Sequence, residues 1–177
     1  MKSLVQGATT LLFMAELALP AFSLAQDKEM MEDCNNAKAE FIKADKEMQS
    51  LFDKSSGYAI FPNVGKGAVG VGGAAGNGIL FENGKPMGKA SMKQVTVGFQ
   101  FGGQAYREVL FFEDQAALDN FKKNKFQFDA QASAVAATAG ASADVKFKNG
   151  VMVFTAAKGG LMYEASVGGQ KFKYSAY

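Results

Sequence analysis

A formal nucleotide-binding pattern stands near the start of the chain. Residues Gly65 to Gly70 read Gly-Lys-Gly-Ala-Val-Gly and match the G-x-G-x-x-G fingerprint of dinucleotide-binding proteins. In that fingerprint a helix begins at the glycines, so that its N-terminus meets the pyrophosphate. Here glycine continues at positions 72, 73, 76 and 78, and each glycine costs a helix about 1 kcal/mol relative to alanine. We therefore expect no nucleotide site, and we predict that the glycines serve two closely packed, curved strands.

The sequence lacks the side chains on which most catalysis and metal binding depend. It has no histidine and a single cysteine, Cys34, which excludes Ser-His and Cys-His nucleophile pairs and leaves too few ligands for zinc. Glu108, Glu113 and Asp114 fall at ordinary strand and helix-cap positions, and their spacing gives no reason to pair them. We expect no enzyme, no cofactor and no metal site. An enzyme would require carboxylates to converge in a pocket that the spacing does not predict.

The charge balance argues against a nucleic-acid partner. The chain has 19 Lys and Arg against 17 Asp and Glu, a net charge of +2, which creates too weak a field to attract nucleic acid. Only Arg107 is an arginine, so bidentate recognition of phosphates or bases by arginine is largely absent. Local groups of lysines matter more than the total.

Two helices are predicted. From Asp27 to Lys54 the apolar residues recur every three or four positions, as on one face of a long amphipathic helix. This apolar stripe is expected to pack on the domain's own sheet, and the alternative is a membrane surface. A second helix is predicted from Gln115 to Lys123, with Asp114 as its N-cap. The stripe of the first helix comprises Met30, Cys34, Ala37, Phe41, Met48, Leu51 and Phe52.

The rest of the chain predicts strands. Three turns are marked by Asn83-Gly84, Asn149-Gly150 and Gly168-Gly169, each between apolar runs that would form a hairpin. Residues 130–143 are rich in alanine, which favours a helix, but an alternation favours a strand followed by a turn at Gly140. The fold class is α+β, a β-rich antiparallel sheet or barrel-like domain with a long N-terminal helix and one internal helix. The predicted strands are 58–61, which ends at Pro62, then 79–81, 87–91, 95–101, 105–112, 126–134, 145–147, 151–153, 161–167 and 171–174.

The N-terminus predicts export. Lys2 precedes an apolar run over residues 11–24, and Ser23-Leu24-Ala25 fits a small-x-small cleavage site. Glu16 and Pro20 interrupt the run and leave too few apolar residues for a transmembrane anchor, which needs about 20. We expect a signal peptide at residues 1–25, a single domain at 26–177, and a periplasmic or secreted protein peripheral to the membrane.

The sequence contains four separated blocks: GYAIFP at 57–62, the glycine-rich run at 65–78, VGFQFGGQ at 97–104 and KGGL at 158–161. Together these blocks resemble the SYLF domain family, in particular its small exported bacterial members. The resemblance extends from about Met30 to Tyr174. It implies binding to phosphoinositides and other anionic membranes, and for some fungal and animal members a link to actin. In the family the helix before the first block is associated with membrane contact, and its counterpart here is Asp27 to Lys54.

Together, the resemblance, the expected export and the missing catalytic groups lead to a functional expectation. We expect a non-enzymatic lipid-binding domain of the cell envelope that engages anionic lipid headgroups, with a homo-oligomer as an option. The alternative is a structural or stress-related envelope protein that acts through protein-protein contacts or self-association. Each lysine group also has an ordinary explanation, as a helix C-terminus or a solvated sheet face. The candidate lipid-binding residues are Lys122, Lys123, Lys125 and Phe126, and the hairpin lysines Lys146, Lys148, Lys171 and Lys173, which we place on adjacent strands.

Overall fold

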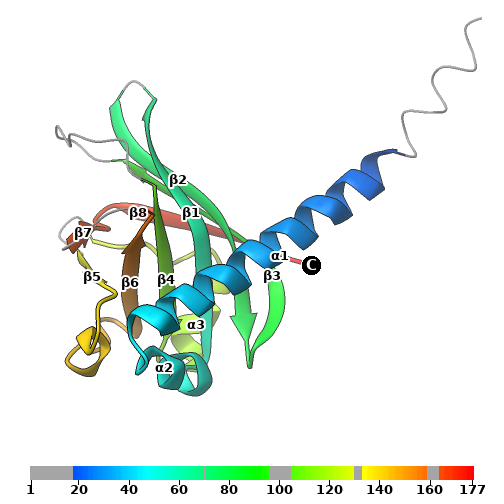
Figure 1. Ribbon diagram of the computed structural model, residues 1–177. Helices are drawn as coiled ribbons and strands as arrows, with labels where there is room; N and C mark the ends of the chain where they lie inside the picture. The colour runs from blue at the N-terminus through cyan, green and yellow to red at the C-terminus, as the bar shows by residue number, and fades with distance from the viewer. Residues whose placement is uncertain (1–17, 70, 96–104, 130–132, 159–163) are drawn as a thin grey trace, which may run out of the picture.

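The computed structural model describes residues 18–69, 71–95, 105–129, 133–158 and 164–177, which form one curved sheet with helices on its two faces (Figure 1). This arrangement confirms the α+β class. The helices are α1 (Ala18–Ala44), α2 (Met48–Lys54), α3 (Gln115–Lys122) and a short 3₁₀ helix (Ala141–Ala143). The strands are β1 (Gly57–Val69), β2 (Val71–Glu82), β3 (Lys85–Val95), β4 (Tyr106–Phe112), β5 (Ser133–Ala136), β6 (Val151–Ala157), β7 (Glu164–Ser166) and β8 (Gln170–Ala176).

The sheet is strongly curled. Over the described residues its strand order is β7-β5-β6-β4-β1-β2-β3-β8, antiparallel except for the β5–β6 pair. Although β7 and β8 lie at opposite ends of this order, only residues 167–169 connect them. The two edges must therefore approach each other in space, which gives an incompletely closed barrel. In the described part of the chain no ladder joins β7 to β8.

This topology corrects the hairpin that we predicted around Gly168-Gly169. The turn is present, and Gly169 has a φ of 74°. However, β7 pairs with β5, and β8 pairs with β3. The apolar alternation identified the strands, but it carried no information on their partners.

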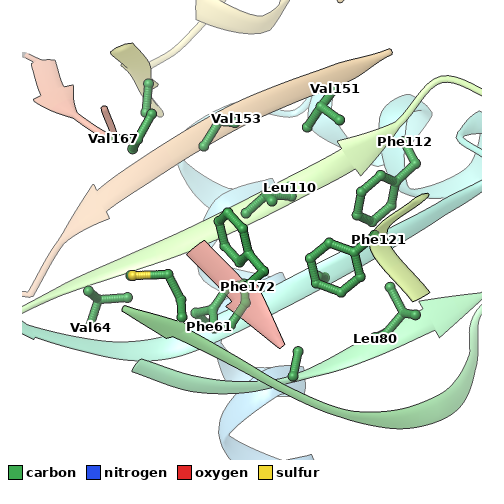
Figure 2. Close-up of a cluster of buried hydrophobic side chains, with 14 of the residues drawn as sticks. Phe61, Val64, Leu80, Leu110, Phe112, Phe121, Val151, Val153, Val167 and Phe172 are labelled. Carbon is green, nitrogen blue, oxygen red and sulfur yellow. The ribbon is translucent and has the colours of Figure 1, made fainter. Parts of the chain in front are cut away.

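The two faces of the sheet carry separate apolar clusters. On the concave face, Phe121 of α3 and Phe172 of β8 pack with Phe61 and Phe112, as Figure 2 shows. On the convex face, α1 and α2 bury their apolar stripe against β1 and β4. Phe41 is fully buried there, which stabilises the packing by about 1.5–3 kcal/mol. The interpretation that the stripe packs on the domain's own sheet is confirmed for these residues.

The prediction of one continuous helix from Asp27 to Lys54 is wrong, because the helix breaks after Ala44. Asp45 is only 2% exposed, and its carboxylate accepts hydrogen bonds from the Ser142 backbone N–H at 2.8 Å and the Ser142 hydroxyl at 2.7 Å. It also accepts one from the Glu47 N–H at 3.1 Å. Burial acts to raise the pKa of Asp45, but these hydrogen bonds outweigh it and lower that pKa. An aspartate that bonds the backbone two residues ahead forms a turn in place of a helix.

The prediction that the first strand ends at Pro62 is also wrong. Strand β1 continues to Val69, and its register shifts around Pro62, between Ile60 and Asn63 against β2 and between Phe61 and Val64 against β4. Proline cannot donate a ladder hydrogen bond and is tolerated at such a bulge. Beyond it, β1 and β2 form the expected glycine-rich pair, in which Gly67 lies opposite Gly73.

Three other local predictions are confirmed. The Asn83-Gly84 hairpin is confirmed, with φ of 51° and 73°. The helix capped by Asp114 is confirmed as α3, since the Asp114 carboxylate accepts a hydrogen bond from the Ala117 N–H at 2.8 Å. For residues 133–140, strand β5 and a turn at Gly140 confirm the strand over the helix.

The Asn149-Gly150 turn exists, but residues 145–147 form no strand, and one isolated bridge joins Lys148 to Val151. Strand 105–112 is confirmed as β4. The predicted strand at 95–101 falls mostly outside the described residues, as do residues 130–132 of the strand predicted at 126–134. The prediction for the start of that second strand is wrong, because residues 126–129 form only an isolated bridge between Gln127 and Lys171.

Candidate functional site

Four lysines gather on the convex face of strands β3 and β8. Ala90 and Met92 of β3 and Phe172 of β8 belong to the concave core. Because successive side chains of a strand point to opposite faces, the residues between them point to the convex side. These residues include Lys89, Lys93, Lys171 and Lys173, all exposed, which we call the lysine patch.

The strand register brings the lysine patch together. Lys93 lies directly opposite Lys171, Ser91 opposite Lys173, and Lys89 opposite Ser175. Like charges directly opposite each other destabilise a strand pair. Lys89 forms an ion pair with Asp27 at 2.5 Å, whereas Lys93, Lys171 and Lys173 make no side-chain ion pair with any described residue. The patch therefore presents three uncompensated positive charges to an anion.

A cleft of about 710 Å³ adjoins the patch, between the N-terminal half of α1 and the convex face of β2, β3 and β8. Asp27, Glu29 and Asp33 line its helix side. Lys89 and Lys173 line its sheet side and belong to the patch as well. Figure 1 shows the N-terminal end of α1 running beyond the edge of the sheet. The cleft therefore opens beside an exposed helix end.

Of the eight residues predicted from sequence, the structure places two in this patch, Lys171 and Lys173. Lys122 is ion-paired with Glu82 at 2.7 Å. Phe126 packs into the concave core, with ring centroids 5.0 Å from Phe128 and 5.7 Å from Phe172.

The remaining four predicted lysines are exposed elsewhere. Lys123 and Lys125 follow α3 directly, and Lys146 and Lys148 lie in the segment ahead of β6. The prediction that Lys146 and Lys148 lie on a strand adjacent to that of Lys171 is wrong. These two lysines are outside the named strands, and four strands separate β6 from β8.

Sequence reasoning missed Lys89 and Lys93. The signal was present, because Lys89-Ala90-Ser91-Met92-Lys93 alternates charged or polar residues with apolar ones, like the lysines of β8. The alternation does not show that β3 pairs with β8, and this pairing sets all four lysines side by side.

A buried polar cluster lies on the concave face, away from the lysine patch. Glu108 of β4 is fully buried, and its Oε2 accepts a hydrogen bond from the Gln170 amide at 2.9 Å. Burial raises the pKa of Glu108 to about 7, and the bond from Gln170 only partly opposes this. Glu108 Oε1, Thr155 Oγ1 and Gln170 Oε1 have no hydrogen-bond partner among the described residues. Burial therefore favours the neutral carboxyl of Glu108 over the carboxylate, against the hydrogen bond from Gln170.

The described part of the chain offers few other features from which a function could be inferred. No group of three or more Cys, Asp or Glu side chains there is placed to hold a metal ion. Burial raises the pKa of the Cys34 thiol to about 12, so it is unreactive near neutral pH. None of the described helices is both long enough and apolar enough to cross a membrane.

A model of a known protein family matches the C-terminal part of the chain. Residues 93–175 match the model described as "Ysc84: Las17-binding protein actin regulator". These residues, just under half of the chain, are therefore similar to the Ysc84/SYLF family. The resemblance inferred from the four sequence blocks is thereby confirmed. The matched residues include β4, α3 and β8, as well as Lys93, Lys171 and Lys173.

A curated protein is similar to this chain over a longer stretch. Beta cell expansion factor A from Aeromonas veronii is 29% identical over 124 residues, which are 69% of this chain and 47% of the relative. The chain therefore spans about half the length of that relative. The similarity supports a domain that the two proteins share. The rest of the relative lies outside the aligned region.

Proposed function

We propose that this chain is a non-enzymatic lipid-binding domain of the cell envelope, which engages anionic headgroups through the lysine patch. The observation that carries the proposal is the set of three lysines, Lys93, Lys171 and Lys173, that share one sheet face and form no ion pair with any residue that the structure describes. Similarity to the Ysc84/SYLF family supports a lipid- or actin-regulator-type domain. The patch adds a specific surface to that general expectation.

The patch has enough charge for measurable binding. Each Lys near an anionic bilayer contributes about 1 kcal/mol, so three contribute about 3 kcal/mol, or roughly 100-fold in affinity. The attraction falls off within a Debye length, about 8 Å at physiological salt. A bilayer must therefore lie directly against the convex face of β3 and β8.

The triple substitution Lys93→Gln, Lys171→Gln and Lys173→Gln tests this surface. We expect it to weaken binding to vesicles containing phosphatidylglycerol by about 100-fold at low salt, because the Coulomb attraction is lost. Co-sedimentation of the purified chain with vesicles of defined composition measures the effect. Binding by the unsubstituted chain should also weaken as salt is raised.

A matched control changes the net charge equally at other sites. Lys123→Gln, Lys125→Gln and Lys146→Gln remove three exposed lysines that lie outside the patch, and these are also predicted lipid-binding residues. We expect this variant to bind almost normally. Equal losses in the two variants would mean that net charge, and no particular surface, governs binding; no loss in either would exclude the patch.

The proposal extends to location. We propose that residues 1–25 are removed during export and that the mature domain begins at Gln26, on the basis of the apolar run and the Ser23-Leu24-Ala25 site. Mass spectrometry of the protein from the periplasmic or culture fraction should then give a chain that starts at Gln26. Recovery of the intact chain from the cytoplasm would contradict the export proposal.

A protein partner is the second candidate function. The description of the matching family names an actin regulator, and a basic face fits an acidic protein as well as it fits a bilayer. Self-association is the other form of this alternative. Co-sedimentation with actin filaments and size-exclusion chromatography, using the two triple variants, distinguish these outcomes from vesicle binding.

A further inference from the structure

The cleft beside the lysine patch separates charges of opposite sign. Its helix wall carries the carboxylates of Asp27, Glu29 and Asp33, and its sheet wall carries the ammonium groups of Lys89 and Lys173. An anionic ligand would meet three carboxylates here, which repel it. A ligand that has both a positive and a negative group would match both walls.

Some of these charges are already satisfied. Lys89 forms its ion pair with Asp27 across the cleft, and Asp33 accepts a hydrogen bond from the Asn63 amide at 3.3 Å. Glu29 and Lys173 make no ion pair with any described residue. These two unmatched charges lie on opposite walls, so one molecule within the cleft can contact both.

The size and the lining also fit a lipid headgroup. A volume of about 710 Å³ lies in the range of small-molecule sites, about 300–1,000 Å³. Met30, Tyr174 and Tyr177 contribute apolar surface to the lining, which suits the glycerol and the first methylene groups of a lipid. Lys173 belongs to the cleft and to the patch, so the cleft is in contact with any bilayer that the patch attracts.

We propose that the cleft binds the headgroup of a zwitterionic, amine-bearing phospholipid such as phosphatidylethanolamine. The phosphate lies near Lys173 on the sheet wall, and the primary ammonium group lies near Glu29 on the helix wall. A primary ammonium donates hydrogen bonds to a carboxylate, whereas the quaternary ammonium of phosphatidylcholine has no N–H to donate. This inference rests on the proposed function, because the patch brings the domain to the membrane and the cleft then selects one lipid.

The test holds the anionic lipid constant and varies the zwitterionic one. Vesicles contain a fixed fraction of phosphatidylglycerol, with phosphatidylcholine or phosphatidylethanolamine as the remainder. We expect the full chain to bind the phosphatidylethanolamine vesicles about 5- to 10-fold more tightly. Glu29→Gln should abolish this preference, whereas its binding to phosphatidylglycerol with phosphatidylcholine should equal that of Glu32→Gln, which removes the same charge.

The control variant is Glu32→Gln, which removes an exposed carboxylate from the same helix outside the cleft lining. It should keep the preference. Equal binding to the two vesicle types, or a preference that survives Glu29→Gln, overturns the inference. If binding to phosphatidylglycerol still depends on the patch, the proposed function stands without it. Binding of soluble glycerophosphoethanolamine in the absence of any vesicle preference would show that the cleft takes free headgroups, which overturns the assignment to a membrane lipid.

Discussion

Glu108→Gln is expected to raise the free energy of unfolding by about 3 kcal/mol at pH 8 and to leave it almost unchanged at pH 4. Glu108 is fully buried on the concave face, and among the described residues its carboxyl receives one hydrogen bond, from Gln170, and forms no ion pair. Burial raises its pKa from the ordinary 4.5 to about 7. The folded protein therefore holds a proton that the unfolded chain releases at lower pH.

The sign of the effect follows from this difference in proton binding. Between pH 4.5 and pH 7 the folded state binds more protons at Glu108 than the unfolded state does, so the stability of the natural protein falls as the pH rises. Above pH 7 both states are ionised there and the loss is complete. Glutamine keeps a polar side chain at this position and cannot ionise, so the variant avoids the loss.

Urea unfolding of both proteins from pH 4 to pH 9 measures the prediction. The difference between their free energies of unfolding should rise between pH 4.5 and pH 7 and then level off. Glu113→Gln is the matched control, because Glu113 is exposed in the bend directly after β4. Parallel stability curves for the natural protein and Glu108→Gln would show that the buried carboxyl is ionised at no cost.

The second large effect is expected at Gly78. A Cβ at this position would overlap the carbonyl oxygen of Ile60 in the neighbouring strand and lie 3.0 Å from a ring carbon of Phe61. The obstacle is backbone, which cannot move without breaking the β1–β2 ladder. Gly78→Ala should therefore lower the free energy of unfolding by about 3 kcal/mol or more.

Gly65→Ala provides the comparison within the same strand pair. A Cβ there meets no heavy atom within 4 Å, so the change in stability should stay within about 0.5 kcal/mol. Thermal unfolding followed by circular dichroism compares the two variants, and recovery of soluble protein gives a second measure if Gly78→Ala does not fold. Normal stability of Gly78→Ala would contradict the close approach of the two strands.

Local signals in the sequence located most elements. Asn83-Gly84 specified its turn because both residues adopt positive φ, and Asp114 specified the start of α3 through a hydrogen bond three residues away. The errors involve distant partners. The break after α1 depends on Ser142, 97 positions from Asp45, and no pattern within one helix encodes it.

The site could be predicted only in part for the same reason. The alternation of Lys171 with Lys173 is local and was recognised, but their neighbours Lys89 and Lys93 depend on the pairing of β3 with β8. The cleft depends further on the path of α1 across the sheet. Periodicity shows which face a residue occupies, whereas strand order decides which faces adjoin.

The position of β8 also determines when the domain can fold. This strand is late in the chain, yet it pairs Ala176 with Gly88 and supplies Phe172 to the concave core. Contacts of such long sequence separation form slowly, because the intervening chain must be ordered first. During synthesis the concave apolar face stays open until residues 170–176 have left the ribosome. Until then the incomplete domain exposes apolar surface, which makes it prone to aggregation.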